Sequence, residues 1–390
     1  MGAPTTPADT APDRADTAPD PADTAPDPAE FLPPDEPVHM LDPDGTFHEH
    51  PDYPLDLDDD QLQEMYRHMM VSRKVDREAI NLQRQGQLGV YASLLGQEAA
   101  QVGGAYALDD GDWVFPSYRE LGVAVTRGVD IGKLLHLFRG TWLSDHDPYE
   151  QQFALYSIPI GTQVLHATGF AMGARFDDNP IVTTAYFGDG ATSEGDPHEA
   201  MNFAGVFKAP VIFFVQNNQW AISVPLSAQT AAPTLAHKAV GYGFPGVVCD
   251  GNDVLATYAV ARQAVARARA GHGPTLIEAL TYRMEAHTTS DDPTRYRTKE
   301  EEEAAAATDP IVRYRNFLRE RGLWSDEFAD EVDAEAAAEA TRMREEIYEA
   351  PHGDPLEVFE HVYVDPTGHF ERQRELLAAE LAAGGEEGSA

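Results

Sequence analysis

The sequence predicts an α/β fold in which a mostly parallel sheet is flanked by helices, with helical extensions at both ends. Two near-continuous apolar runs, residues 180–187 and 210–216, have the composition of strands that are buried on both faces. Residues 197–207 between them predict a helix, as the crossover of a parallel pair requires. A helix over residues 253–270 and a third strand over residues 275–283 continue this alternation, which is typical of a parallel sheet.

Two further helices are expected before these strands in the sequence. Apolar residues recur at helical spacing between residues 58 and 85, and residues 96–108 predict a second helix with a face of small residues. The N-terminus repeats the letters "ADTAPD" without any apolar seam, which is typical of a disordered segment. We therefore expect a disordered acidic tail rich in Pro, Asp and Ala over residues 1–36, an α/β domain over residues 37–323, and an acidic helical region over residues 324–390.

The composition excludes several classes of function. The formal net charge is −38, which repels nucleic acid and anionic membranes, and no basic cluster opposes it. No apolar run reaches the roughly 18 residues of a membrane-spanning helix, no basic and apolar leader is visible, and the single cysteine, Cys249, cannot form an internal disulfide. We expect a cytoplasmic protein that binds neither nucleic acid nor membranes. Its acidity fits either a halophilic cytoplasm or a biased genomic composition.

The stretch "YFGDGATSEGD" follows the first predicted strand and places Asp189 between Gly188 and Gly190. A dinucleotide fingerprint would need a third glycine where Ser193 stands, and no phosphate loop ending in Gly-Lys-Ser/Thr is present. A divalent cation between Asp189 and a phosphate would explain the acidic residue, because the ion reverses the sign of the interaction. Taken alone, Asp189 also fits a helix cap or a turn.

A second oxygen donor is expected from the next strand. Asn217 and Asn218 stand at its carboxyl end, and both strands of a right-handed βαβ unit end at the same edge of the sheet. Asp189 and Asn218 can therefore converge on one Mg²⁺ ion, which prefers oxygen ligands. Taken alone, the two asparagines also fit a turn.

The pattern "GDG", residues 191–216, then "NN" resembles the thiamine-diphosphate-binding motif. From about residue 37 to about residue 323 the chain resembles the alpha subunit of the decarboxylating component of 2-oxo acid dehydrogenase complexes. The stretches "RQGQLGVYASLLGQEAAQ", "WVFPSYRELG", "SIPIGTQVLHATG" and "EALTYRMEAHTTSDDPTRYR" carry the resemblance. It implies the thiamine-diphosphate-binding fold, specifically its diphosphate-binding domain. The pyruvate dehydrogenase type is favoured, with the branched-chain type as the alternative.

The resemblance implies roles for particular residues. Mg²⁺ would be held by Asp189, by Asn218 and by the main-chain carbonyl of Trp220, and His287 would be catalytic beside the diphosphate. The cofactor would be contacted by Tyr118, Arg119, Ile158, Ile160, Gly188, Asp189, Gly190, Ala191, Asn218 and His287. A monovalent cation would lie near Ser157, Thr162 and Gln163. The segment with Ile158 and Ile160 fits an apolar core strand equally well by residue type.

Other positions in the resemblance concern the substrate and the acceptor. Gln216 stands where some branched-chain relatives have an arginine on the diphosphate, which leaves more of that charge to Arg119 and His287. The substrate pocket would be lined by Val90, Ser117 and Ile158. The loop that receives a lipoyl domain would include Arg283, Asp291, Tyr296 and Arg297, which also fit a charged loop tied by local salt bridges.

The implied reaction is the oxidative decarboxylation of a 2-oxo acid with reductive acylation of a lipoyl group. In this family a glutamate on a second domain activates the cofactor, and this chain carries only one α/β unit of the required kind. The resemblance therefore implies a beta subunit in an α2β2 heterotetramer, together with a lipoyl-bearing acyltransferase core component. A Mg²⁺-dependent phosphohydrolase and a non-catalytic acidic binding protein are the other classes that the sequence leaves open.

Overall fold

The centre of the protein is a five-stranded parallel sheet with the strand order β1-β2-β3-β7-β6. The computed structural model describes residues 28–140, 146–349, 354–360 and 362–387, and the sheet lies within them. Its strands are β1 (Trp113–Phe115), β2 (Thr183–Gly188), β3 (Val211–Asn217), β6 (Gly246–Asp250) and β7 (Thr275–Leu280). The expected α/β class with a mostly parallel sheet is confirmed.

Three of the strands match the expected runs, with shifted ends. β2 begins at Thr183 rather than at Pro180, and β7 ends at Leu280, before the expected end at Arg283. β1 and β6 were not expected. β1 has three residues, and β6 lies between Pro245 and Gly251, so neither is long enough to show a strand period in the sequence.

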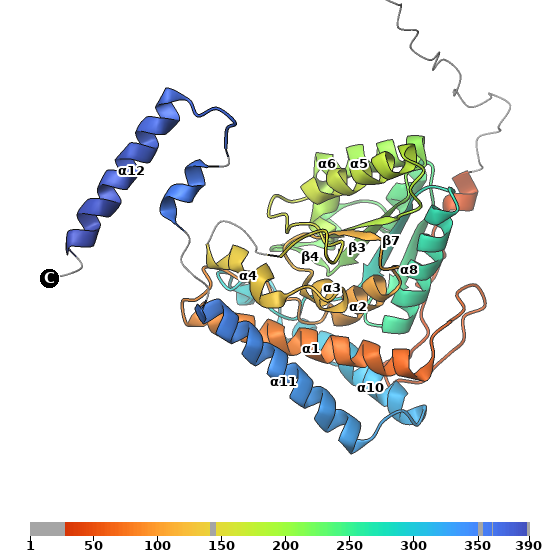
Figure 1. Cartoon of the computed structure of the whole chain (residues 1–390). Helices are drawn as coiled ribbons and strands as arrows, with labels where there is room; N and C mark the ends of the chain where they lie inside the picture. The colour runs from red at the N-terminus through yellow and green to blue at the C-terminus, as the bar shows by residue number, and fades with distance from the viewer. Residues whose placement is uncertain (1–27, 141–145, 350–353, 361, 388–390) are drawn as a thin grey trace, which may run out of the picture.

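Two layers of helices cover the sheet (Figure 1). On one face lie α5 (Thr162–Phe176) and α6 (Gly195–Phe207), and on the other lie α2 (Glu98–Tyr106) and α8 (Val254–Arg269). A further layer outside α2 contains α1 (Asp59–Arg84), α10 (Pro310–Glu320) and α11 (Asp326–Glu349). The sheet is therefore buried on both faces, which explains the apolar composition of its strands.

Helix α1 forms where the sequence predicts it. A capping box holds its start, because the Asp58 side chain accepts from the Gln61 amide and the Gln61 side chain accepts from the Asp58 amide. The apolar residues at helical spacing, among them Leu62, Met65 and Met69, are buried. Helix α1 thus presents one face to the core and the other to solvent.

Helix α11 packs along α1 in the same core. It buries one stripe of side chains, namely Phe328, Val332, Ala336, Ala340, Met343 and Ile347. In Figure 1 helix α12 (Gly368–Glu387) stands apart from this body, beside the short 3-10 helix η5 (Pro355–Phe359). The division of the chain at residue 323 stays a prediction, and the repeat in residues 1–27 lies outside the described residues.

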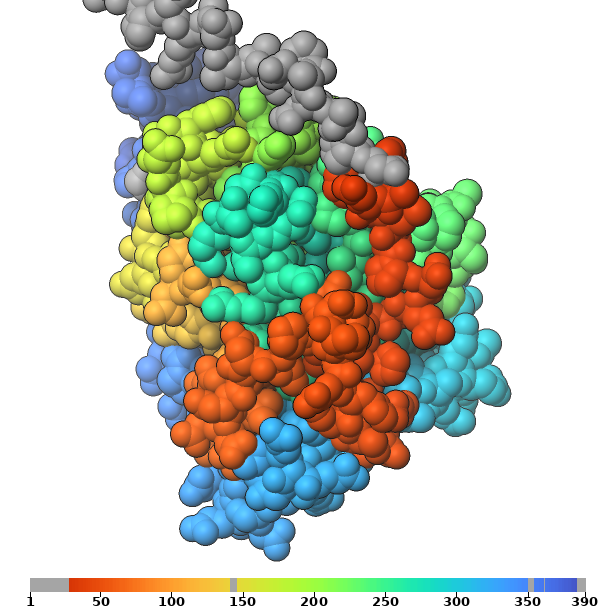
Figure 2. Space-filling view, turned by 90° about the vertical axis from the view of Figure 1, so that its right-hand side faces the viewer, coloured from red at the N-terminus to blue at the C-terminus, as the bar shows by residue number. Residues whose placement is uncertain are grey.

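The segment before α1 contacts the edge strand β6 at Val38, and Figure 2 shows this segment in red and orange at the surface. Val38 pairs with β6 there: its amide donates to the Val248 carbonyl at 2.9 Å, and its carbonyl accepts from the Asp250 amide at 2.9 Å. The edge strand β6 is therefore covered rather than free. Among the described residues, no helix has both the length and the apolarity needed to cross a membrane.

The remaining described helices are short connections. They are α3 (Leu121–Thr126), α4 (Ile131–Arg139), α7 (Leu226–Gln229) and α9 (Lys299–Ala306), with the 3-10 turns η1 (Pro28–Phe31), η2 (Asp189–Ser193), η3 (Ala236–Tyr242) and η4 (Pro293–Arg295).

Candidate active site

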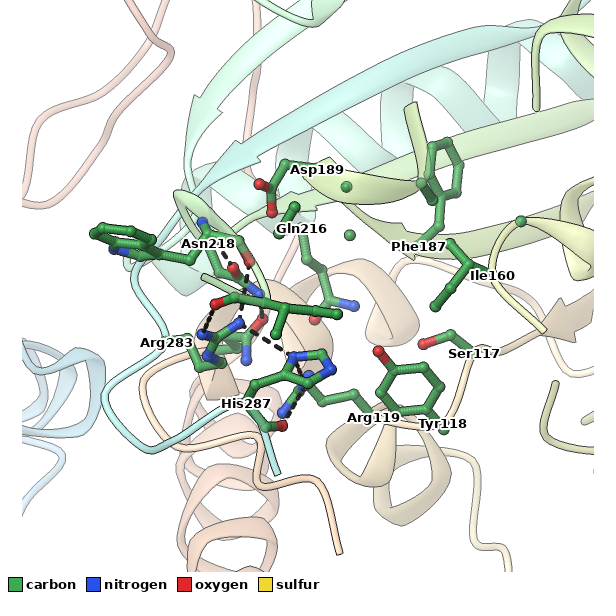
Figure 3. A pocket seen from close by; sticks show the side chains of 18 of the residues that line it. Ser117, Tyr118, Arg119, Ile160, Phe187, Asp189, Gln216, Asn218, Arg283 and His287 are labelled. Carbon is green, nitrogen blue, oxygen red and sulfur yellow. Dashed lines mark hydrogen bonds between the residues drawn. The ribbon is translucent and has the colours of Figure 1, made fainter. Parts of the chain in front are cut away.

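The carboxyl ends of β2 and β3 lie side by side, with Gly188 opposite Gln216. Beyond β2 the chain turns into η2, and beyond β3 it forms a small hairpin of β4 (Trp220–Ala221) and β5 (Val224–Pro225). A cavity of about 190 Å³ opens at this edge, and Figure 3 shows residues from separate parts of the chain pointing into it. It lies where ligands bind in open parallel sheets.

Asp189 is almost fully buried at the wall of this cavity, with 1% of its surface exposed. Burial raises the pKa of its carboxyl, and a hydrogen bond from Gln229 opposes that rise. In that bond Gln229 Nε2 lies 2.6 Å from Asp189 Oδ2. A buried carboxylate of this kind gains from a nearby cation.

The two asparagines after β3 point in different directions. Asn217 donates to Glu278 Oε1 at 2.7 Å, within the sheet. Asn218 lines the cavity: its Nδ2 donates to Gln97 Oε1 at 3.2 Å, and its Oδ1 accepts from the Trp220 amide at 3.3 Å. Asn218, and not Asn217, is therefore placed for a ligand.

The predicted metal ligands come together at the cavity. Asp189, Asn218 and Trp220 all line it. The Trp220 carbonyl accepts from Arg283 Nη1 at 3.0 Å, so each of the three groups has a protein partner in this structure. Among the described residues, no group of three or more His, Cys, Asp or Glu side chains is placed to hold a metal ion. A site here would instead use one carboxylate, one amide and one carbonyl.

The glycines beside Asp189 differ in the space around them. A Cβ built at Gly190 would lie 2.8 Å from the Ala221 Cβ, closer than real contacts allow, so the η2 turn and the β4 strand can approach only because residue 190 has no side chain. No atom lies within 4 Å of a Cβ built at Gly188. The chain at Gly188 is thus open toward the cavity that it lines.

Two guanidinium groups and an imidazole meet on the opposite wall (Figure 3). Arg119 donates through Nη2 to the His287 carbonyl at 2.8 Å, and the same nitrogen lies 3.3 Å from His287 Nδ1. Arg283 Nη1 lies 3.4 Å from that Nδ1. The ring of Tyr118 stands edge-on to the His287 ring, with centroids 6.2 Å apart.

The positive charge here is not fully balanced. Burial first, and then Arg119 and Arg283, lower the pKa of His287 to about 3. Burial, and then the charge of Arg119, lower the pKa of Arg283 to about 10. Two buried cations that repel each other are stabilised by an anion, although the chain as a whole carries a net charge of −38. The cavity therefore suits a diphosphate, with open backbone at Gly188 and a buried carboxylate on the opposite wall for a bridging cation.

Some residues expected at the site lie elsewhere. Ile160 lines the cavity, while Ile158 and Val90 do not, and their exposed fractions are 45%, 49% and 38%. Residues 158–160 form an irregular, exposed segment before α5, so the alternative of an apolar core strand is wrong. In this chain Ile158 and Val90 are surface residues.

Of the three residues expected near a monovalent cation, Thr162 and Gln163 begin α5 and Ser157 lies in the irregular segment before it. Gln163 is buried, its Nε2 donates to the Tyr186 carbonyl at 2.9 Å, and its Oε1 has no hydrogen-bond partner. Ser157 donates to the Pro159 carbonyl at 3.2 Å, and Thr162 is the first residue of α5. An unpaired buried oxygen at Gln163 is compatible with a cation, whose site stays a prediction.

The four residues assigned to a lipoyl-receiving loop differ in exposure. Arg283 and Arg297 are buried, and Arg297 donates to the main-chain carbonyls of Arg283 and Glu285. Asp291 accepts from the His287 amide at 2.9 Å and from the Tyr296 hydroxyl. The two arginines thus hold the loop from inside this chain and do not present their charge at its surface.

A polar network in the cavity wall was not predicted. Gln216 accepts from Gln101 Nε2 at 2.8 Å and donates to Glu120 Oε1 at 2.6 Å. Glu120 also accepts from the Ser117 hydroxyl at 2.7 Å, and burial raises the pKa of its carboxyl. The sequence does not reveal this network, because Gln101, the pair Ser117 and Glu120, and Gln216 come from three separate parts of the chain. Gln216 thus links a neutral and an acidic side chain, and it brings no positive charge to the position where some branched-chain relatives have an arginine.

The fold and this cavity define an α/β protein with a cavity at the carboxyl edge of a parallel sheet, lined by two buried guanidinium groups and a buried carboxylate. Residues 66–356 match the protein family described as "Dehydrogenase E1 component", and the chain belongs to that family. Together with its relatives, this match identifies the chain as an alpha subunit of the thiamine-diphosphate-dependent 2-oxo acid dehydrogenases.

Several relatives match over most of their length. The chain is 54% identical to the 3-methyl-2-oxobutanoate dehydrogenase subunit alpha of Mycobacterium tuberculosis (strain ATCC 25618 / H37Rv), over 89% of this chain and 95% of the relative. It is 42% identical to the pyruvate dehydrogenase E1 component subunit alpha of Bacillus cereus, over 82% and 87%. The subunit with the same name from Staphylococcus aureus (strain COL) is 40% identical, over 87% and 92%.

Proposed function

We propose that this chain is the alpha subunit of a thiamine-diphosphate-dependent dehydrogenase that acts on branched-chain 2-oxo acids. The observation that carries the substrate class is the 54% identity to a 3-methyl-2-oxobutanoate dehydrogenase subunit, against 42% and 40% to pyruvate dehydrogenase subunits. The pyruvate type, which the sequence favours by resemblance, becomes the second candidate.

The cavity supports a specific orientation of the cofactor. Its diphosphate would lie against Arg119 and His287, along the open backbone from Gly188 to Ala191. Mg²⁺ would join the diphosphate to Asp189, to Asn218 and to the Trp220 carbonyl, and Gln229 and Arg283 would give up their present bonds to two of these groups. Tyr118 and Ile160 would contact the part of the cofactor that points out of the cavity.

When bound, thiamine diphosphate supplies the carbanion that attacks the 2-oxo carbon and the electron sink for the decarboxylation. His287 is the group of this chain that can serve the reacting atoms. Its Nδ1 faces the N–H groups of Arg119 and Arg283 and therefore accepts, which assigns the proton of the neutral ring to Nε2. Nε2–H can then donate to a phosphate oxygen or to a developing oxyanion.

The site also needs a partner chain. The carboxylates lining the cavity are Asp189, which we assign to the metal, Glu120, which is bonded to Ser117 and Gln216, and Glu194. We infer that the carboxylate that activates the aminopyrimidine comes from a beta subunit, in an α2β2 assembly. The acyl group would pass to a lipoyl-bearing acyltransferase, and a monovalent cation near Ser157, Thr162 and Gln163 would order the start of α5.

Kinetics of the assembled enzyme test the substrate class. The alpha chain is combined with its beta subunit, and kcat/KM is measured for 3-methyl-2-oxobutanoate and for pyruvate with an artificial electron acceptor. We expect the branched-chain acid to be preferred by at least about tenfold, or ~1.4 kcal/mol in transition-state binding. A preference for pyruvate would move the chain to the pyruvate type, and phosphate release without decarboxylation would indicate a phosphohydrolase.

A further inference from the structure

Asp76 is a buried carboxylate outside the cavity, on helix α1. All three donors that it accepts from belong to one short stretch of chain. Tyr91 donates its hydroxyl to Oδ1 at 2.8 Å, Ser93 donates its hydroxyl to Oδ2 at 2.6 Å, and the Leu94 amide donates to Oδ1 at 2.9 Å. Hydrogen bonds to a charged acceptor are among the stronger ones in proteins, so Asp76 fixes this stretch to α1.

The same stretch holds Arg119. The Ser93 carbonyl accepts from Arg119 Nη1 at 2.6 Å, while Nη2 of the same guanidinium donates to the His287 carbonyl. A guanidinium is planar, so a bond at each end sets both its position and its tilt. The place of the Arg119 charge in the cavity therefore depends on where the Ser93 carbonyl stands.

The stretch also holds the segment that carries His287. The Thr289 amide donates to the Tyr91 carbonyl at 2.9 Å, and the Tyr91 amide donates to Thr289 Oγ1 at 3.1 Å. On the other side of His287, the Met284 amide donates to the Leu95 carbonyl at 3.0 Å. Residues 91–95 thus contact the His287 segment at both ends.

We propose that Asp76 is a positioning residue for the active site. By holding residues 91–95 it fixes the Arg119 guanidinium and the His287 segment together, so that both face the diphosphate position in one arrangement. The inference rests on the proposed function for the roles of Arg119 and His287. The predicted coupling between Asp76 and residues 284–289 does not require the cofactor, so it can be measured on the cofactor-free chain.

The test compares two buried carboxylates. Asp253 is as buried as Asp76 and accepts from the Met40 and Leu41 amides at 2.6 Å, away from residues 91–95. Amide hydrogen exchange is measured on the full-length chain for the wild type, Asp76→Ala and the control Asp253→Ala. We expect Asp76→Ala to speed exchange in peptides covering residues 284–292 by about tenfold, the effect of one lost hydrogen bond to a charged group. Asp253→Ala should speed exchange near its own helix and leave residues 284–292 unchanged.

Milder variants keep the test decisive if Asp76→Ala does not fold. Ser93→Ala removes one donor to Asp76 and keeps the carbonyl that binds Arg119, so a smaller increase in the same peptides is expected. Asp76→Asn keeps an acceptor for Leu94 and should stay within about threefold of the wild type. If amide exchange in Asp76→Ala and Ser93→Ala became faster by the same factor throughout the chain, the proposal would be overturned, because Asp76 would then stabilise only the fold.

Kinetics of the assembled enzyme give a second measurement. Asp76→Ala should raise the thiamine diphosphate concentration needed for half-maximal activity by about tenfold and change KM for the 2-oxo acid by less than about twofold. An equal rise in both constants would contradict a role directed at Arg119 and His287. A wild-type enzyme that binds no thiamine diphosphate would overturn the proposed function, while the exchange comparison would still decide the role of Asp76.

Discussion

At the scale of single residues, the candidate site contains charged groups whose burial disfavours their charged forms. Asp189 is a buried acid whose pKa burial raises, and Arg283 is a buried base whose pKa burial and Arg119 lower. Each shift means that folding leaves the charged form less favourable than it is in water. Binding of Mg²⁺ and a diphosphate would stabilise both charges. The free energy that burial of these charges costs in the free chain would then be offset on binding, which favours the ligand pair.

Replacing Asp189 by Asn tests this compensation. Asp189→Asn should weaken thiamine diphosphate binding in the presence of Mg²⁺ by at least about tenfold, or ~1.4 kcal/mol, and should remove its dependence on Mg²⁺. The free energy of unfolding of the free chain should not fall, because a neutral amide is easier to bury than a carboxylate. Calorimetric titration with and without Mg²⁺ measures the affinity, and urea unfolding measures the stability.

The matched control for that variant is Asp196→Asn, in the first turn of α6 and outside the cavity lining. It should leave both quantities unchanged. If Asp189→Asn keeps the full Mg²⁺ dependence, the metal is held elsewhere.

His287 makes a prediction about pH. Its pKa falls from 6.5 to about 3 on folding, so between these values the unfolded chain binds more protons than the folded one. Stability from this group is therefore complete above pH 6.5 and is lost as the pH falls toward 3, by at most about 1.4 kcal/mol per pH unit. Urea unfolding between pH 7.5 and about pH 5 should show a steeper loss for the wild type than for His287→Gln.

The difference between the two curves isolates His287, since the other titrating groups are shared. Parallel curves for the wild type and His287→Gln over that range would mean that the imidazole keeps an ordinary pKa, and its assignment as a neutral donor would fail.

At the scale of elements, the site depends on how closely the turn after β2 approaches the strand after β3. Gly190 allows that approach because its missing Cβ would lie 2.8 Å from the Ala221 Cβ. Gly190→Ala should force η2 and β4 apart and cost about 1–3 kcal/mol of folding free energy, as overpacking does elsewhere. It should also weaken Mg²⁺-dependent cofactor binding, because Asp189 and the Trp220 carbonyl stand on opposite sides of the contact.

Gly188→Ala is the paired control. Nothing lies within 4 Å of a Cβ at that position, so the stability of the free chain should stay within about 0.5 kcal/mol of the wild type. The urea midpoints of Gly190→Ala and Gly188→Ala are compared. Equal losses of stability in the two variants would show that Gly190 is not needed for the approach of η2 to β4.

The longer strands and helices of this fold could be predicted from the sequence. The long strands β2, β3 and β7 and the helices α1, α6 and α8 have periods or apolar runs long enough to be recognised. The GDG and NN segments could be assigned to one edge because parallel strands must end together. Strands β1 and β6 could not be found, since their length is set by tertiary pairing with β2 and β7 rather than by local pattern.

The side-chain network could be predicted only in part, for a related reason. Asp189, Asn218, Arg119 and His287 lie in recognisable motifs, and the structure brings them to one cavity. Gln97 and Glu120 also line the cavity, and Gln229 donates to Asp189 from outside it, yet no role was predicted for any of the three from the sequence. Ile158, which the resemblance places at the aminopyrimidine and in the substrate pocket, does not line this cavity and is exposed on this chain, so its role stays a prediction.

At the scale of the whole molecule, charge and exposure both indicate an incomplete active site. In the proposed function the cavity would bind the anionic end of a cofactor, and its rim carries exposed apolar side chains at Ile160 and Ile222, with exposed fractions of 45% and 56%. A rim of this kind is typical of a surface that a second chain covers. The part of the cofactor that reacts would project past this rim, beyond the groups that this chain supplies.

The last prediction concerns the division of the activity between two chains. The purified alpha chain should not decarboxylate 2-oxo acids, because we assign its cavity to the diphosphate end of the cofactor and the carboxylate that activates the aminopyrimidine to the beta subunit. Adding the cognate beta subunit should create activity and also tighten cofactor binding. Both effects are expected because the beta subunit would cover the apolar rim of the cavity. Decarboxylation assays on the alpha chain, the beta chain and their mixture measure this, with Asp189→Asn alpha in the mixture as the control with weakened cofactor binding. Robust turnover by the alpha chain alone would mean that one of its own carboxylates, Glu120 or Glu194, activates the cofactor, and the partner would then not be needed for chemistry.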